Sequence, residues 1–323
     1  MKRTNADFFR DNLKAFDAVL APMAGVTDMA FRRICVQNNC HITFSEMVSA
    51  KGLINQNQST LEYLNKASEE KCFGVQIFGS TPSVLSHAVE LYLNKADLDF
   101  IDINMGCPVR KVFSNGDGSA LLKDINLVYS VASAVVNASE KPVSAKIRIG
   151  VDGVNVAVEA ATALSEAGVG LVTVHGRTRE QMYSGKADWI TIAKVVESVK
   201  IPVIANGDVF NVDSYHDIKK ITDCEGVMIA RGALGNPFIF RQIYEAINTG
   251  QYGEISLNER LDTARLHFDY LLESKKEEIA INEFRKHFAW YTKGLRASAA
   301  LRNEINQLKT RDEIKKKLSF LME

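Results

Sequence analysis

The sequence has little of what marks a secreted, metal-binding or membrane protein. No two of its cysteines form a C-x-x-C motif, which argues against a zinc site or a disulfide framework and favours a reducing compartment. The uncharged stretch 125–139 is shorter than the roughly 20 apolar residues that span a bilayer. The N-terminal segment lacks an apolar core, so we expect no signal peptide, no membrane anchor and a cytoplasmic location. The five cysteines are Cys35, Cys40, Cys72, Cys107 and Cys224.

The chain also lacks an excess of charge of one sign. Its 39 Lys and Arg residues balance 39 Asp and Glu residues, which excludes a uniformly basic nucleic-acid coat. The balance hides an asymmetry, because ten basic residues face only three acidic ones between Arg285 and Leu318. A basic end of this kind is typical of proteins that bind RNA phosphates, although a solvated helix face has the same composition.

Short apolar runs recur along the first three quarters of the chain. Runs so short and continuous are typical of parallel strands buried on both faces. The segments between them have helical spacing, clearest at 83–93, 125–136, 154–167 and 189–199. The alternation predicts an α/β fold, a (β/α)₈ TIM barrel; a doubly wound sheet is the alternative, which the lack of G-x-G-x-x-G after the first run disfavours. The runs lie at 18–25, 42–48, 72–79, 100–106, 143–150, 171–177, 202–208 and 226–232.

The pattern changes to helices alone after residue 245. Helical signals follow at 257–274, 281–294, 297–308 and 311–321, and no strand pattern returns. We therefore predict a catalytic barrel domain at 1–245 and a C-terminal all-helical bundle domain at 246–323. Because eight strands can close their own sheet, we expect the barrel to keep its cofactor chemistry without the bundle.

Polar side chains stand at the carboxyl ends of nearly all the predicted strands, where barrel enzymes have their active sites. Lys146 lies inside an apolar strand, and a lysine there is costly unless it meets an anion or is neutral. It could hold the electron-rich edge of a reduced flavin, form a Schiff base as in an aldolase, or only reach out to solvent. Gln76 and His175 offer neutral donors and acceptors for the edges of a planar ring.

Glycines at the last two strand ends predict a phosphate site. NGD (206–208) and ARGALGNP (230–237) follow strands seven and eight, where barrels often bind phosphate, so we expect a phosphorylated cofactor. Cys107 lies between Gly106 and Pro108 on a fixed turn, where its thiol could donate a proton or act as a nucleophile. The glycine-rich segment 115–122 is a candidate mobile lid.

Motifs spread over the whole chain carry a family resemblance. They are APMAGVTD (21–28), INMGCPVRKV (103–112), GSALL (118–122), KIRIG (146–150), VHGRTREQMYSGKADW (174–189), IANGDV (204–209) and MIARGALGNPFIF (228–240). Together they resemble the tRNA-dihydrouridine synthases, and RKHFAWYTKG (285–294) is similar to the helical domain of the bacterial B-like subgroup. The resemblance implies an FMN-binding barrel, NADPH (or NADH) as electron donor, and a helical tRNA-binding domain.

The resemblance also implies residue roles. Hydride would reach carbon 6 of a D-loop uridine, Cys107 would protonate carbon 5, and Asn104 would meet the uracil. On the tRNA side we add Arg148, Arg177, Lys286, Lys315, Lys316 and Lys317. Ala230 stands where many relatives have Gly. The implied cofactor-binding residues are Pro22, Met23, Ala24, Gln76, Lys146, His175, Asn206, Gly207, Asp208, Ala230 and Arg231.

Other functions stay open at this point. An FMN barrel acting on a free pyrimidine, like a dihydroorotate dehydrogenase, would explain Lys146 and Cys107 but not the basic helices. A non-catalytic tRNA-binding protein would explain the helices but not the barrel mouth. The favoured interpretation predicts a tRNA partner bound through its D-loop and elbow region, where flipping a uridine is cheapest, with no metal and a monomeric enzyme.

Overall fold

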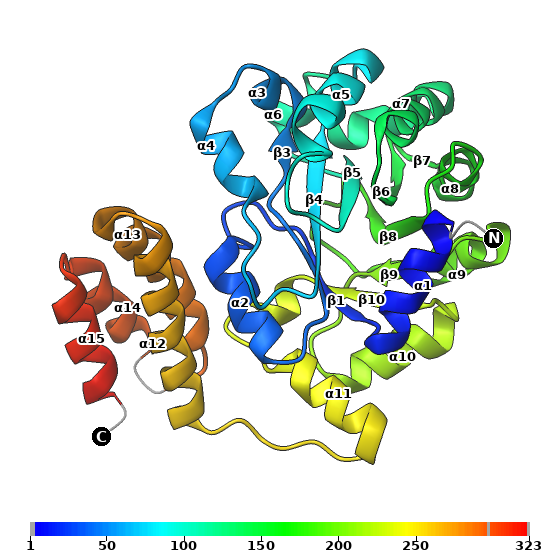
Figure 1. Cartoon of the computed structure of the whole chain (residues 1–323). Coiled ribbons are helices and arrows are strands. Elements are labelled where there is room, and N and C mark those ends of the chain that lie inside the picture. The colour runs from blue at the N-terminus through cyan, green and yellow to red at the C-terminus, as the bar shows by residue number, and fades with distance from the viewer. Residues whose placement is uncertain (1–3, 296–297, 322–323) are drawn as a thin grey trace.

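The computed structural model describes residues 4–295 and 298–321. In these residues eight parallel strands form a nearly closed barrel, with the hydrogen-bonded order β1-β10-β9-β8-β6-β5-β4-β2, and the end strands β1 and β2 contact one another (Figure 1). The predicted TIM barrel is therefore confirmed. The strands are β1 (Ala18–Leu20), β2 (Ile42–Phe44), β4 (Cys72–Phe78), β5 (Phe100–Met105), β6 (Val143–Val151), β8 (Leu171–Thr178), β9 (Val203–Asn206) and β10 (Gly226–Ile229), with β3 (Val48–Ser49) beside β4.

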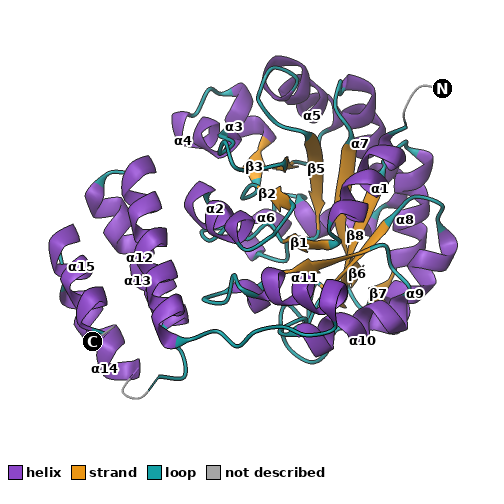
Figure 2. Ribbon diagram, turned by 60° about the horizontal axis from the view of Figure 1, so that its bottom comes forward, coloured by secondary structure: helices purple, strands orange, loops and turns teal. Residues whose placement is uncertain are grey.

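Helices surround this barrel (Figure 2). They are α1 (Asn5–Ala15), α2 (Met29–Gln37), α3 (Ala50–Ile54), α4 (Gln58–Leu61), α5 (Pro82–Ala88), α6 (Arg110–Phe113), α7 (Ile125–Ala138), α8 (Ala157–Glu166), α9 (Trp189–Ser198), α10 (Val212–Thr222) and α11 (Ile239–Thr249). A π-helical turn, Val89–Leu93, continues α5. Short 3₁₀ helices lie at Glu62–Leu64, Gly118–Lys123 and Arg231–Ala233.

The helix predicted at 154–167 begins later than expected. Val154–Asn155 forms β7, which pairs antiparallel with the end of β6. Asp152 and Gly153 connect the two strands with φ angles of 51° and 77°. A two-residue Asp-Gly loop with both φ angles positive favours a tight hairpin, and this local signal outweighs the helical spacing of the residues that follow.

The barrel interior is apolar at one end and polar at the other. α1 covers the amino ends of the strands, where Phe9 and Leu13 join Phe44 and Phe100 in one apolar cluster. The Phe9 and Phe100 rings meet edge to face, with centroids 5.3 Å apart. This apolar plug fills the amino end, so the polar side chains of the strands gather at the carboxyl end.

Four helices follow the barrel in the described residues, as the sequence predicted: α12 (Leu257–Ser274), α13 (Glu277–Tyr291), α14 (Ser298–Gln307) and α15 (Arg311–Phe320). They dock on α2, whose Ala30 and Ile34 share an apolar cluster with Phe268 and Phe284. Lys275, just after α12, pairs with Asp28 at the N-cap of α2 at 2.6 Å.

The domain boundary predicted at residue 245 falls inside α11. Ile239, Phe240 and Ile243 of this helix belong to the apolar core of the barrel. We therefore propose that the barrel domain ends at Thr249, and that the residues 250–256 join it to the bundle.

Candidate active site

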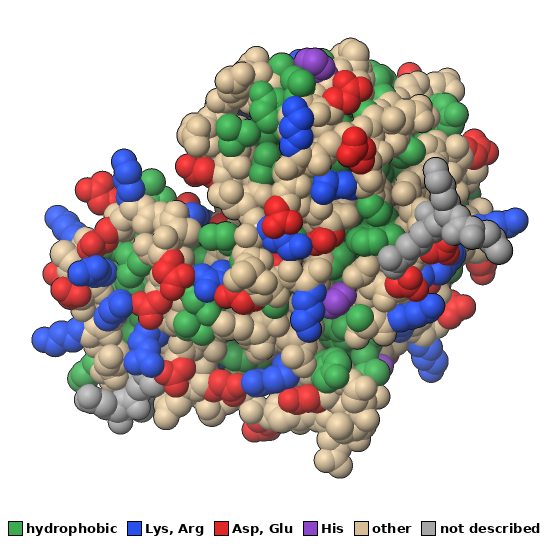
Figure 3. All heavy atoms as spheres, viewed as in Figure 1, with side chains coloured by type: hydrophobic (Ala, Val, Ile, Leu, Met, Phe, Trp, Pro, Cys, Tyr) green, Lys and Arg blue, Asp and Glu red, His purple; other side chains and the backbone are tan. Residues whose placement is uncertain are grey.

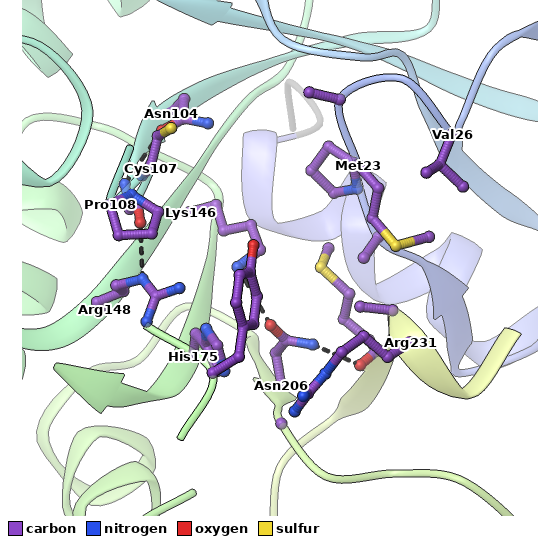
Figure 4. A pocket seen from close by; sticks show the side chains of 18 of the residues that line it. Met23, Val26, Asn104, Cys107, Pro108, Lys146, Arg148, His175, Asn206 and Arg231 are labelled. Carbon is purple, nitrogen blue, oxygen red and sulfur yellow. Dashed lines mark hydrogen bonds between the residues drawn. The ribbon is translucent and has the colours of Figure 1, made fainter. Parts of the chain in front are cut away.

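A cavity of about 380 Å³ opens at the carboxyl ends of the barrel strands. Its size falls in the range of about 300–1,000 Å³ that is usual for small-ligand sites. The structure brings every residue predicted to bind a cofactor to its wall, together with Asn104, Cys107 and Arg148. In Figure 4, Asn104 and Cys107 lie across the pocket from Met23 and Val26, with Lys146 and Asn206 between them.

Lys146 on β6 reaches the cavity and donates to Asn206 Oδ1 at 3.2 Å. Asn206 is held in turn by its own donation to the carbonyl oxygen of Met228 at 2.7 Å. Enclosure by the barrel, and then the nearby Arg148, lower the pKa of Lys146 to about 7. A lysine in this state gains a proton readily when a negative charge arrives beside it.

His175 on β8 presents a neutral imidazole to the cavity. Burial lowers its pKa far below the ordinary value, and the positive charges of Lys146 and Arg148 act in the same direction. A neutral ring offers one donor and one acceptor nitrogen. This character agrees with the neutral group that the sequence predicted at this position.

Cys107 is fixed through its backbone. Its N–H donates to Asn104 Oδ1 at 2.9 Å, and its carbonyl oxygen accepts from the N–H and hydroxyl of Ser119 at 3.1 and 2.8 Å. Burial raises the pKa of the thiol, although Arg148 and Lys146 act in the opposite direction. The group therefore stays a thiol at neutral pH, which favours a proton donor over a nucleophile.

The glycine-rich segment does not form the lid expected at 115–122. Residues 118–123 form a 3₁₀ helix in which Ser119, Leu121 and Leu122 are buried. The bonds from Ser119 to Cys107 show what this segment does instead. It holds the turn that carries the Cys107 thiol in place through the backbone of that turn.

Asp208, just after β9, binds two arginine side chains. Its carboxylate accepts from Arg177 at 2.7 Å and from Arg231 at 3.2 Å. Gly207 before it has a φ of +129°, and a Cβ there would lie 2.7 Å from that of Ala187, so the backbone turn needs glycine. Arg177 is 1% exposed and is absent from the cavity wall. The sequence analysis expects it to face the tRNA substrate, but in the structure it holds Asp208 instead.

Arg148 joins several loops at the cavity mouth. It lines the cavity while donating to the carbonyl oxygens of Gly106, Thr178 and Met182 at 2.8, 2.9 and 2.9 Å. Burial lowers its pKa to about 10, which leaves it charged at neutral pH. It therefore brings a fixed positive charge to the site as well as holding the loops together.

Three parts of the site escaped the sequence analysis. Tyr183 and Phe210 line the mouth, and the Arg231 guanidinium lies 5.3 and 5.7 Å from their ring centroids. Asp102 is buried beneath the wall on β5. A signal for Asp102 was present, because it lies two residues before Asn104 and residues so spaced on a strand share a face.

The predicted tRNA-side lysines differ in their surroundings. Lys315 pairs with Asp269 at 2.6 Å, and Lys317 pairs with Glu304, whereas Lys316 is exposed. Lys286 donates to the carbonyl oxygen of Gly25 in the loop that lines the cavity. Arg296, counted in the basic segment, lies outside the described residues.

The bundle also carries exposed cations that the prediction did not single out as tRNA contacts. They include Lys293, Arg302, Lys309 and Arg311. Figure 3 shows basic side chains on this lobe interspersed with acidic ones.

The described residues hold neither a metal-ligand cluster nor a membrane-spanning helix. No three His, Cys, Asp or Glu side chains gather there as metal ligands would. Over the same residues, no helix has the length and apolar character required to cross a bilayer. All five cysteines are free thiols, and Cys35, Cys40, Cys72 and Cys224 are buried.

Comparisons with known proteins show which family the chain belongs to. The chain is 37% identical over 306 residues to a probable tRNA-dihydrouridine synthase of Rickettsia conorii, covering 93% of this chain and 92% of that one. It is 36% identical to tRNA-dihydrouridine synthase B of Pasteurella multocida (90% and 87% covered) and 37% to that of Pseudomonas aeruginosa (91% and 89%). A solved histamine dehydrogenase from Rhizobium sp. 4-9 has the same fold, with a TM-score of 0.55 at 11% identity over 79% of this chain and 49% of that one. The family model for dihydrouridine synthase (Dus) matches residues 19–322, so the chain belongs to the dihydrouridine synthase family.

Proposed function

We propose that this protein is a flavin-dependent tRNA-dihydrouridine synthase, which uses FMN and NADPH (or NADH) to reduce uridine in the D-loop of tRNA. The observation that carries the proposal is the meeting of Lys146, His175 and Cys107 in one cavity of a family member. The named relatives act on tRNA, which supports the same substrate here. A tRNA substrate also favours a location in the cytoplasm.

The residues present fit FMN. Lys146 offers a cation where a reduced flavin ring carries negative charge, and Gln76 and His175 offer neutral groups for its edges. Arg231, whose side chain is 38% exposed, offers charge for a phosphate beside the glycine-rich ends of β9 and β10. When bound, the flavin supplies hydride, taken from NADPH, to carbon 6 of a uracil.

The chain's own groups would complete the reduction. The Cys107 thiol would give its proton to carbon 5 of the base. Asn104, on the same side of the cavity, would orient the base, and Pro22, Met23 and Ala24 would contact the flavin. Because the cavity is enclosed by the carboxyl ends of the barrel strands, the target uridine must leave its stack to enter.

The bundle would hold the rest of the tRNA. Its exposed cations, such as Lys293, Arg302 and Lys309, are free of ion pairs with any described residue and could meet phosphates of the elbow region. Arg148 would add a fixed positive charge at the mouth of the cavity. Lys315 and Lys317 are engaged with acids of the bundle, so we rank them below the exposed cations as tRNA contacts.

The test separates the two half-reactions. The purified protein should be yellow, bleach with NADPH, and regain its colour when mixed with tRNA transcribed without modifications. Mapping dihydrouridine in that tRNA then identifies the reduced position. If a free pyrimidine such as orotate reoxidises the flavin and tRNA does not, the enzyme belongs with the free-pyrimidine flavoenzymes instead, and a protein that binds tRNA but never bleaches is a binding protein.

A further inference from the structure

Asp102 lies beneath the cavity and is joined to its wall by hydrogen bonds. Its Oδ2 accepts from Gln76 Nε2 at 2.6 Å, and its Oδ1 accepts from Ser144 Oγ at 2.6 Å. Gln76 Oε1 in turn accepts from Asn104 Nδ2 at 2.7 Å. All three bonds are buried. Asp102 itself is absent from the cavity wall, whereas Gln76 and Asn104 belong to it.

The side-chain amides of Gln76 and Asn104 can each adopt only one orientation. Asp102 fixes the first, and backbone N–H groups fix the second. An ionised carboxylate can only accept, so Gln76 must turn its nitrogen to Asp102 and its oxygen to Asn104. At the other end, the backbone N–H groups of Gly106 and Cys107 can only donate, and they face Asn104 Oδ1 at 3.2 and 2.9 Å. Asn104 must therefore turn its nitrogen to Gln76, and the two requirements agree.

One N–H of Asn104 is left for a ligand. Its nitrogen lies 3.9 Å from Met47 Sδ, and a thioether is a weak acceptor. Met47 also lines the cavity, so a stronger acceptor that entered there would compete for this N–H. Either carbonyl oxygen of uracil is such an acceptor, whereas cytosine carries an amino group on carbon 4, which would meet the N–H as a second donor.

We propose that Asp102 is a positioning residue, which acts through Gln76 to hold Asn104 with an N–H directed at a carbonyl oxygen of the target base. This inference rests on the function proposed above. It assigns to a buried carboxylate the fixed orientation of an amide that touches the substrate, and a contact with the oxygen on carbon 4 would select uracil over cytosine.

The titration of Asp102 provides a way to test the arrangement. Burial raises the pKa of Asp102 to about 6, and the bonds from Gln76 and Ser144 and the charge of Lys146 act in the opposite direction. Among the described residues, Lys146 on β6 is the charged group that acts on Asp102, while Gln76 on β4 and Ser144 on β6 are neutral. Below that pKa the carboxyl group can donate, and the constraint on Gln76 is lost.

The first experiment compares Asp102→Asn with the wild-type FMN-loaded enzyme. An asparagine can present either its oxygen or its NH₂ group to Gln76, so it no longer forces the orientation in which Gln76 accepts from Asn104. We expect reoxidation of the reduced enzyme by unmodified tRNA to slow by roughly 10- to 100-fold, the usual cost of a misplaced contact group. Reduction by NADPH in the absence of tRNA should slow by less, because Asn104 takes no part in it and the reversal of Gln76 alters only one of the neutral groups that face the flavin.

The second experiment follows pH, with Ser144→Ala as the matched variant. The wild-type rate of reoxidation by tRNA should fall as pH drops through about 6. This acid limb should be absent in Asp102→Asn. It should move to higher pH in Ser144→Ala, which loses a bond that lowers the pKa of Asp102 but keeps the bond from Gln76. An infrared carboxylic-acid band, present in wild type at low pH and missing in Asp102→Asn, measures the same titration without turnover.

The outcomes separate this inference from the proposed function. If tRNA fails to reoxidise the reduced wild-type enzyme, the proposed function is wrong and the inference falls with it. If tRNA works on the wild type and Asp102→Asn slows both half-reactions equally, or neither, the positioning role is overturned. If Asp102→Asn does not fold, an acid limb and an infrared band that Ser144→Ala leaves unmoved would overturn it.

Discussion

Lys286, on α13 of the bundle, donates a hydrogen bond from Nζ to the carbonyl oxygen of Gly25, in the loop after β1. The N–H of the same Gly25 donates to the carboxylate of Glu46. Gly25 has a left-handed φ of +70°, and its neighbours Ala24 and Val26 line the cavity. The bundle therefore holds one wall of the active site from outside the barrel.

Because of this contact, a barrel without the bundle should not keep its full affinity for FMN, contrary to the expectation from the sequence. We now expect deletion of residues 250–323 to weaken FMN binding, because the loop loses Lys286 and the deletion also exposes Ala30 and Ile34 on α2. In the full chain, Lys286→Met should raise the Kd for FMN by about tenfold, the loss of one hydrogen bond from a charged group. Fluorescence titration measures it, with Lys286→Arg as the rescue and Lys316→Met as the control. Equal FMN affinity in all of these proteins would show that the wall needs no support.

Cys107→Ala should bind FMN and be reduced by NADPH like the wild type. Its reduction of uridine should slow by roughly 10²- to 10⁴-fold, because the thiol supplies only the proton for carbon 5. Burial raises the pKa of this thiol, so the wild-type rate should persist to pH values above the ordinary cysteine range before it declines. Stopped-flow reoxidation by tRNA measures both effects. A colourless variant would point instead to a structural role for the side chain.

Lys146→Met should lower the midpoint potential of the flavin and slow its reduction by NADPH. The cation stabilises the negative charge of a reduced ring, and methionine keeps only the length of the side chain. Because the pKa of Lys146 is lowered to about 7, the wild-type reduction rate should fall as pH rises above that value, while the profile of the variant stays flat. Potentiometry and stopped-flow bleaching test this, and unchanged values would leave Lys146 without a role at the flavin.

Changing Lys315, Lys316 and Lys317 together to Gln should reduce the salt dependence of tRNA binding only slightly. Two of these lysines pair with acids of the bundle, so the triple variant should lose only about one contact with a tRNA phosphate. Changing Lys293, Arg302 and Lys309 together to Gln should make the slope of log Kd against log salt clearly shallower. Anisotropy titrations at several salt concentrations compare the two triple variants. The reverse ranking would place the RNA on α15.

Acid should weaken the bundle through two buried histidines. The rings of His267 and His287 lie 4.3 Å apart beneath Phe31 of α2. Burial lowers the pKa of His267 to about 4 and that of His287 well below its ordinary value. The folded state therefore binds fewer protons than the unfolded one, so stability is full above about pH 6.5 and falls as pH drops toward 4.

Thermal unfolding at about pH 7.5 and about pH 5 measures this loss. In His287→Leu the difference in Tm between the two pH values should shrink. Neither ring nitrogen of His287 has a hydrogen-bond partner in the described residues, so leucine removes a proton-binding group without breaking a bond. A variant as acid-sensitive as the wild type would assign the effect to other groups.

The order of the elements and most of the site residues could be predicted from the sequence alone. The eight apolar runs became the barrel strands, because strands buried on both faces must be apolar throughout and this pattern is local. Lys146, His175 and Cys107 could be named as site residues because each stands in or just after an apolar strand, and the carboxyl ends of all strands of a barrel meet at one mouth. The motif resemblance supplied the family, which the comparisons confirm.

The contacts between these groups could not be predicted in this way, because they depend on the folded barrel. Arg177 holds Asp208, Lys286 supports the loop at Gly25, and Asp102 reaches Asn104 through Gln76, and each of these contacts joins residues on different elements. The pKa values of Lys146 and Cys107 likewise depend on burial and on the charges that the folded barrel brings beside them. Strand spacing predicts which face a side chain occupies, but not which partner from another strand it meets, because that depends on the register and closure of the whole barrel.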